Sequence, residues 1–111
     1  MEERRPISIR ELPLSERLKI FIVVLSEGKN KIISSGQSIT PQDENAMRRY
    51  YASIRSWQNA RGADTPPRKL QEVEDQLQES RKNLERLAQN SGGTKATVIY
   101  SLFGVARDLF E

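Results

Sequence analysis

The sequence predicts an all-α protein, folded as a small antiparallel bundle of about four helices. Apolar residues recur at helical spacing in four segments, and residues that start or stop helices bound each segment. The length of 111 residues is enough for one domain with one core. We therefore expect a single helical domain at residues 14–111, preceded by an N-terminal arm at residues 1–13.

The arm is expected to be extended, because Ile7 and Ile9 alternate with polar residues ahead of Pro13. The alternative for this segment is a frayed terminus.

The first helix is predicted over residues 14–27, with Gly28 in the position that commonly follows a helix end. This segment is apolar almost all round, so we expect it to be covered on more than one side. Its many β-branched residues leave a second interpretation open, in which residues 19–25 and 31–35 form two strands.

The second helix, residues 41–61, has the clearest start in the chain. Thr40 can cap the free amides, and Pro41 suits the first helical position. The apolar stripe that should face the core consists of Met47, Tyr50, Tyr51, Ile54 and Trp57.

The third and fourth helices are predicted at residues 67–90 and 94–110. The third carries a heptad seam in which Ser80 is the one polar position. The residues of this seam are Leu70, Val73, Leu77, Ser80, Leu84 and Leu87. The fourth is mostly apolar, and Gly104 within it suggests that another backbone approaches closely there. Together these two helices present more apolar surface than a small chain easily covers, so we expect that a homodimer could complete the bundle.

Catalysis is not expected from this composition. The chain contains neither His nor Cys, which removes imidazole bases, thiolate nucleophiles and the usual zinc ligands. Three acids of the third helix, Glu72, Asp75 and Glu79, lie opposite the seam and should be solvated, while Asp43 and Glu44 suit a helix start. We therefore predict no enzyme activity, no cofactor and no metal site.

A surface for nucleic acid is the alternative function. The chain has 18 Lys and Arg against 15 Asp and Glu, a net charge of +3, and the excess gathers around the second helix. The aromatic residues there lie on the core stripe and are expected to pack inside. The candidates for phosphate contacts are Arg48, Arg49, Arg55, Arg61, Arg68 and Lys69.

The function we expect first is binding of another protein, as an adaptor, assembly factor or small regulator. The RNA- or DNA-binding helical dimer is the second hypothesis. We expect a soluble cytoplasmic protein, because the longest apolar run, residues 20–25, is too short to span a membrane. The candidates for the partner interface are Leu77, Leu84, Phe103 and Phe110.

Overall fold

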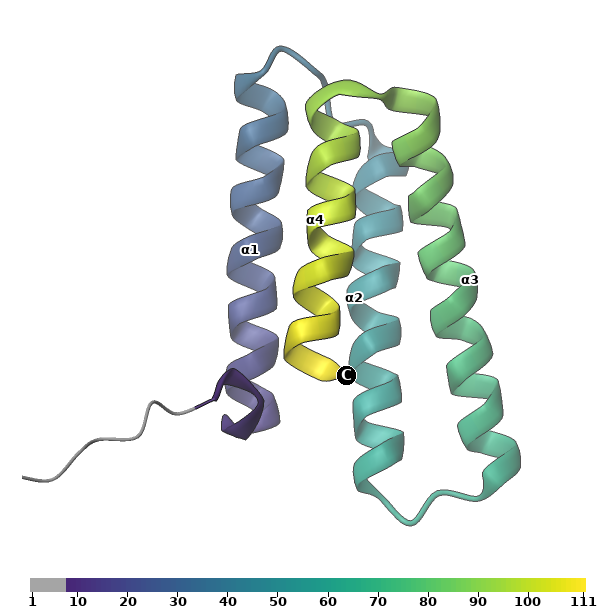
Figure 1. Ribbon diagram of the computed structural model, residues 1–111. Coiled ribbons are helices and arrows are strands. Elements are labelled where there is room, and N and C mark those ends of the chain that lie inside the picture. The colour runs from purple at the N-terminus through teal and green to yellow at the C-terminus, as the bar shows by residue number, and fades with distance from the viewer. Residues whose placement is uncertain (1–7) are drawn as a thin grey trace, which may run out of the picture.

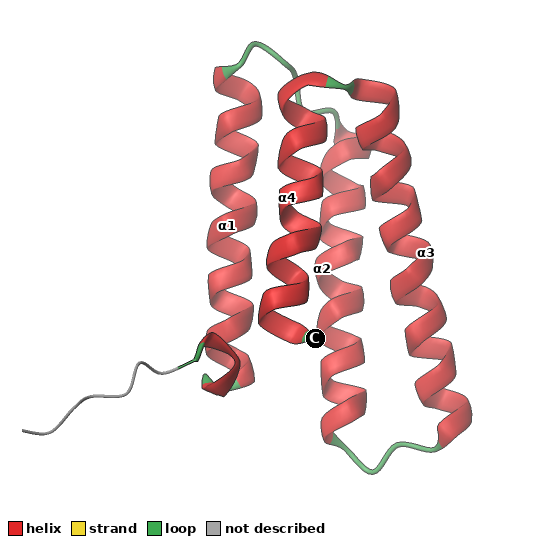
Figure 2. Ribbon diagram, in the orientation of Figure 1, coloured by secondary structure: helices red, strands yellow, loops and turns green. Residues whose placement is uncertain are grey.

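Four helices account for most of the chain in the computed structural model, which describes residues 8–111 (Figure 1). Successive helices run in opposite directions, and no strand occurs in the described residues (Figure 2). The predicted all-α bundle is therefore confirmed. The helices are α1 (Leu14–Ser34), α2 (Pro41–Gly62), α3 (Pro67–Ser91) and α4 (Gly93–Phe110).

The helices pack as neighbours in the order α1, α4, α3, α2. α4 lies between α1 and α3 (Figure 1), which explains why its sequence is so apolar. α1 and α2 touch over a much shorter stretch than the other neighbouring pairs. The largest side chains that are fully buried are Phe21, Ile32, Met47, Leu84, Ile99, Leu102 and Leu109.

The seam of α3 is covered within the chain by α2 and α4. Leu84 is fully buried, and the polar position of the seam is satisfied locally, because the Ser80 hydroxyl donates to the Leu77 carbonyl at 2.9 Å. Within the chain the seam is thus buried at Ser80 and Leu84 and partly buried at its other positions.

The prediction that the first helix ends at Gly28 is wrong. α1 continues to Ser34 and turns at Gly36, whose φ of 94° favours glycine. Gly28 is buried because it faces α4: a Cβ placed there would lie 2.7 Å from Cγ1 of Val98. The two-strand interpretation is wrong as well, since the turn after Gly28 buries Ile32 in the helical core.

The described part of the arm is not extended. Ile9–Glu11 form one turn of 3-10 helix (η1) that packs against α4, and the Ser8 hydroxyl accepts from the Arg10 amide at 3.4 Å. The remainder of the predicted arm, residues 1–7, lies outside the described residues.

Candidate binding surfaces

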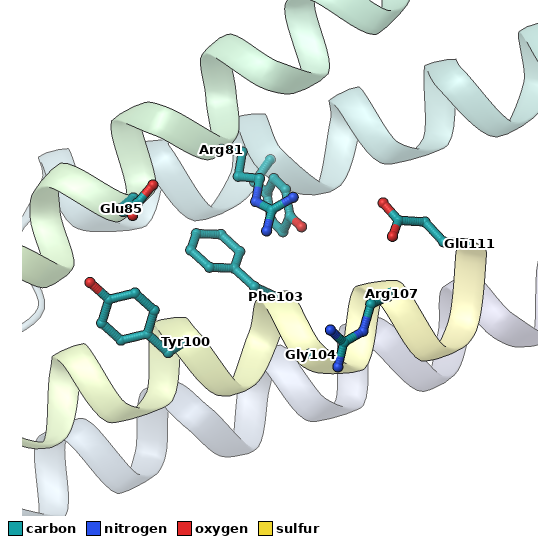
Figure 3. Close-up of a pocket in the computed structure, with 8 residues that line it drawn as sticks. Arg81, Glu85, Tyr100, Phe103, Gly104, Arg107 and Glu111 are labelled. Carbon is teal, nitrogen blue, oxygen red and sulfur yellow. The ribbon is translucent and has the colours of Figure 1, made fainter.

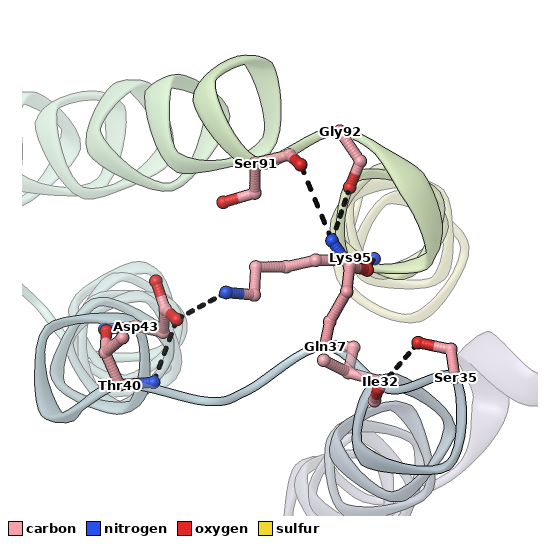
Figure 4. A network of polar contacts seen from close by, with 8 residues as sticks. All are labelled: Ile32, Ser35, Gln37, Thr40, Asp43, Ser91, Gly92 and Lys95. Atoms are coloured by element: carbon pink, nitrogen blue, oxygen red, sulfur yellow. Dashed lines mark hydrogen bonds and ion pairs between the residues drawn. The ribbon is translucent and has the colours of Figure 1, made fainter.

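A buried polar network joins the start of α2 to the start of α4 (Figure 4). The predicted cap is confirmed: the Thr40 hydroxyl accepts from the Asp43 amide at 3.1 Å, and Asp43 accepts from the Thr40 amide at 3.0 Å. Lys95 Nζ donates to the same carboxylate at 2.7 Å, and both side chains are at most 8% exposed. Gln37 closes the network by accepting from the Lys95 amide and donating to the Gly92 carbonyl.

The carboxyl group of Asp43 stays ionised in this network. Burial raises its pKa, but hydrogen bonds from Lys95 and Thr40 outweigh that effect and hold the pKa below its ordinary value. The sequence indicated the helix-start role of Asp43 and missed its ion pair. The missed signal is spacing, because Lys95 precedes the buried Ile99 and Leu102 by four and seven residues and so shares their face.

Arginines from three elements hold the last carbonyls of α4. Arg17 Nη1 donates to the Leu109 carbonyl at 2.9 Å, and Arg10 Nε donates to the Asp108 carbonyl at 3.3 Å. Arg61 Nη1 donates to the Phe110 carbonyl at 3.4 Å, and its guanidinium lies 4.6 Å from the ring centroid of Trp57. Arg61 therefore supports the fold, and a phosphate contact at this residue stays a prediction.

The other predicted basic residues do not form one ridge. Arg48 and Arg55 are exposed on the side of α2 that faces α1. Arg48 lies one turn after Glu44, which pairs with Lys29 of α1. Arg55 lies one turn after Tyr51, which stacks on Phe21 of α1. Arg49 lies on the other side of α2, in a groove with α3. Arg68 and Lys69 are exposed at the start of α3, next to the loop that joins α2 to α3 (Figure 1).

The groove between α2 and α3 has a volume of about 420 Å³. α2 contributes Gln42, Asn45 and Arg49, and α3 contributes Asn83, Arg86 and Asn90. None of the carboxylates in residues 8–111 lines this groove. Its polar wall therefore combines two cations with neutral amides.

A second pocket, of about 290 Å³, opens between α3 and α4 (Figure 3). Both signs of charge line it, from Arg81 and Glu85 on α3 and from Arg107 on α4. The Arg81 guanidinium lies 5.1 Å from the ring centroid of Phe103, which forms one wall. The predicted close approach of a backbone at Gly104 is wrong, since no heavy atom lies within 4 Å of a Cβ placed there and the residue lines this pocket.

Tyr50 of α2 lines the same pocket and is only 4% exposed. Burial raises the pKa of Tyr50 to about 12, with Arg81 lowering it and Glu111 raising it by smaller amounts. The phenol is therefore a hydrogen-bond donor throughout the neutral range. The pocket thus offers this donor beside charges that largely offset one another.

The four residues proposed for a partner interface pack inside the chain. Leu84 and Phe110 are buried, and Leu77 and Phe103 are partly buried against the core. Phe103 meets Tyr50 edge to face at 5.5 Å between ring centroids. Their burial leaves little apolar surface for a partner at these positions.

Three of the five exposed large apolar side chains of the described residues lie on α1, and the other two are Ile9 of η1 and Tyr100 of α4. Ile22, Val23 and Ile33 are 48%, 55% and 59% exposed, although each has a large β-branched side chain. The signal was present in the sequence as a helix apolar almost all round, but the sequence did not show which side the bundle leaves open.

Searches of protein-family models, curated proteins and solved structures found no match to this chain. Among residues 8–111, no helix is both long enough and apolar enough to cross a membrane.

Proposed function

We propose that this chain is a non-catalytic binding module whose partner is an amphipathic helix of another protein with acidic residues along its flanks. The observation that carries the proposal is the exposed apolar surface of α1 formed by Ile22, Val23 and Ile33, here called the α1 face. A cluster of exposed large apolar side chains on a small protein commonly marks a site of interaction.

Ile22 and Ile33 of the α1 face lie on one side of the helix, with the polar Ser26 and Lys29 between them. They are eleven residues apart, about three turns, and Val23 lies next to Ile22. Phe21 and Ile32 each precede Ile22 and Ile33 by one residue, so they lie about 100° round the helix, and both are fully buried. A partner helix laid along α1 would cover this face in addition to the contacts that α1 makes with α4 and α2, as expected for a helix that is apolar almost all round.

The charges around the α1 face favour an acidic partner. On α1 itself the nearby charges offset one another, because Lys19 pairs with Glu16, Lys29 pairs with Glu44, and Glu27 is exposed one turn after Val23. The excess positive charge comes from Arg48 and Arg55, which are exposed on the adjacent side of α2. The three ion pairs formed by the described residues involve neither of these arginines. Free cations at the rim of an apolar contact speed association with an acidic partner and select against a basic one.

The ionisable side chains of this protein support a binding role rather than a catalytic one. His and Cys are absent from the sequence, and the acids Glu72, Asp75 and Glu79 are exposed on α3. Proton transfer requires a group whose pKa is adjusted toward neutrality and which is held against a substrate. Asp43, with a lowered pKa and a lysine on its carboxylate, is occupied structurally.

The test is to isolate a partner with the full chain and then measure its binding to purified variants by calorimetry. Ile22→Asp with Ile33→Asp should weaken binding at least about tenfold while the circular dichroism spectrum stays unchanged, because both side chains are exposed. Arg48→Glu with Arg55→Glu should also weaken it, and more so at low salt.

The matched control is Arg68→Glu with Lys69→Glu, which makes the same change in charge beside the loop that joins α2 to α3. A partner that binds the Ile22, Ile33 variant with unchanged affinity would rule out the α1 face. Homodimerisation stays a prediction, so light scattering should also measure the oligomeric state of the unmodified chain and of the Ile22→Asp, Ile33→Asp variant. A dimer that these aspartates dissociate would identify the occupant as a second copy and overturn the acidic helix.

A further inference from the structure

We infer that the groove between α2 and α3 binds the backbone of a single-stranded nucleic acid, with Arg49 and Arg86 contacting its phosphates. The two arginines come from neighbouring helices and line one groove of about 420 Å³ that no described carboxylate lines. This site is separate from the α1 face, and the inference does not depend on the proposed protein partner.

Arg49 has no acid on its own helix to neutralise it. α2 contains two acids, and both are engaged elsewhere. Asp43 is buried against Lys95 at 2.7 Å, and Glu44 pairs with Lys29 of α1 at 3.5 Å. The guanidinium of Arg49 is thus left available to an anion from outside the chain.

Arg86 is similarly available on α3. Its one hydrogen bond within the described residues goes to Oδ1 of Asn83 at a long 3.4 Å and involves a neutral acceptor. The adjacent acid, Glu85, lines the α3–α4 pocket on another side of the helix. Two guanidinium groups without carboxylates beside them create a positive potential that selects phosphate, which arginine can bind through two parallel hydrogen bonds.

The rest of the groove suits a nucleotide better than a bare anion. Gln42, Asn45 and Asn90 supply neutral amide donors and acceptors, and Ala46 with Leu87 supplies apolar surface. Amides of this kind can bond to base edges and sugars, while apolar side chains contact the faces of bases. A single strand can turn successive phosphates toward both arginines, whereas a duplex is too stiff to bend into a local groove.

The experiment measures fluorescence anisotropy of a labelled single strand of about 12 nucleotides with the full chain, between about 50 and 200 mM salt. Three double variants each remove two positive charges: Arg49→Ala with Arg86→Ala, Arg48→Ala with Arg55→Ala, and Arg68→Ala with Lys69→Ala. All six residues are exposed, so thermal unfolding should be little changed and serves as the control for folding.

The groove variant should bind at least about tenfold more weakly and lose about 1.4 from the slope of log affinity against log salt, the value for two phosphates of a single strand. The other two variants should stay within about threefold of the unmodified chain and keep its slope. Equal losses in all three variants would indicate diffuse attraction and overturn the site.

Three further outcomes would also overturn the inference. The first is no binding by the unmodified chain at low salt. The second is a duplex that binds as tightly and depends equally on Arg49 and Arg86. The third is a poly-glutamate peptide that displaces the strand at equal charge concentration, because the groove would then accept acidic proteins in place of nucleic acid.

Discussion

Among interactions of single side chains, we expect loss of the ion pair between Lys95 and Asp43 to lower the free energy of unfolding most. Replacing Lys95 with Met leaves a buried carboxylate without its cation, since both side chains are at most 8% exposed. We expect Lys95→Met to lower the free energy of unfolding by about 3–5 kcal/mol at neutral pH, measured by urea denaturation.

A companion variant separates lost charge from lost packing. Lys95→Met combined with Asp43→Asn removes both charges and keeps a side chain that can cap α2, so it should recover part of that loss. If Lys95→Met changed the free energy of unfolding by less than about 1 kcal/mol, the pair would not be buried in the way the structure indicates.

Gly28 illustrates a glycine kept for space within a helix. Alanine favours helix by about 1 kcal/mol over glycine, yet a Cβ at this position would lie 2.7 Å from Val98 Cγ1. We expect Gly28→Ala to destabilise the protein by about 1–3 kcal/mol in thermal or urea unfolding.

The control for Gly28→Ala removes the clash from the other helix. In a Val98→Ala background the added methyl group has room, so Gly28→Ala should become neutral or stabilising there. At Gly104, by contrast, an added methyl group has room in the unmodified protein, because no heavy atom lies within 4 Å of the added Cβ. An unchanged cost of Gly28→Ala in the Val98→Ala background would contradict the contact between α1 and α4.

At the scale of elements, the end of α4 depends on its neighbours. The carbonyls of its last turn accept from Arg10, Arg17 and Arg61, which lie on η1, α1 and α2. Cations at a helix C-terminus favour the helix through both hydrogen bonds and the helix dipole. Arg17→Ala should therefore lower the free energy of unfolding by about 1–2 kcal/mol in urea denaturation.

Arg48→Ala is the matched control for Arg17→Ala, since Arg48 is exposed on α2 and takes part in none of the three ion pairs of the described residues. Its effect should stay within about 0.5 kcal/mol. Equal effects of the two substitutions would mean that the α4 contacts add nothing beyond the general charge of the surface.

The elements that the sequence predicted well have strong local signals. Thr40 with Pro41 starts α2, and the amphipathic pattern of residues 67–90 gives α3, so both helices match the prediction to within one residue at either end. α1 failed at Gly28 because a local stop signal cannot reveal that Val98 lies opposite. The length of α1 is decided by burial of Ile32, a contact between distant parts of the chain.

At the scale of the whole molecule, stability should fall in acid. The pKa of Asp43 is lowered in the folded protein from its ordinary 3.8, so the unfolded chain takes up a proton there more readily than the folded one. The carboxylate therefore contributes stability above that ordinary value, and the contribution is lost as the pH falls through the folded pKa.

The measurement for this prediction is the urea midpoint of the unmodified chain and of Asp43→Asn between about pH 7 and pH 2.5. The difference between the two proteins should be largest near neutrality and should shrink in acid. A difference that stays constant over this range would show that ionisation of Asp43 is unconnected with folding.

The candidate sites were harder to predict than the fold, for a reason that only the whole molecule supplies. Helical spacing placed Arg48 with Arg55, yet the groove brings Arg49 together with Arg86 from another helix. Likewise, Leu84 and Phe110 looked available for a partner until the bundle covered them, while Ile22 and Ile33 stayed open. Which side of a helix remains free follows from the arrangement of its neighbours.

The packing order of the helices also has a consequence for how the chain is made. α2 and α3 are adjacent in sequence and can pair as soon as both have left the ribosome, since their contacts are local. α1 emerges first but has its main neighbour in α4, which is translated last of the four. During that interval Phe21 lacks its contact with Phe110 of α4, so the growing chain carries exposed apolar surface of the kind that chaperones bind.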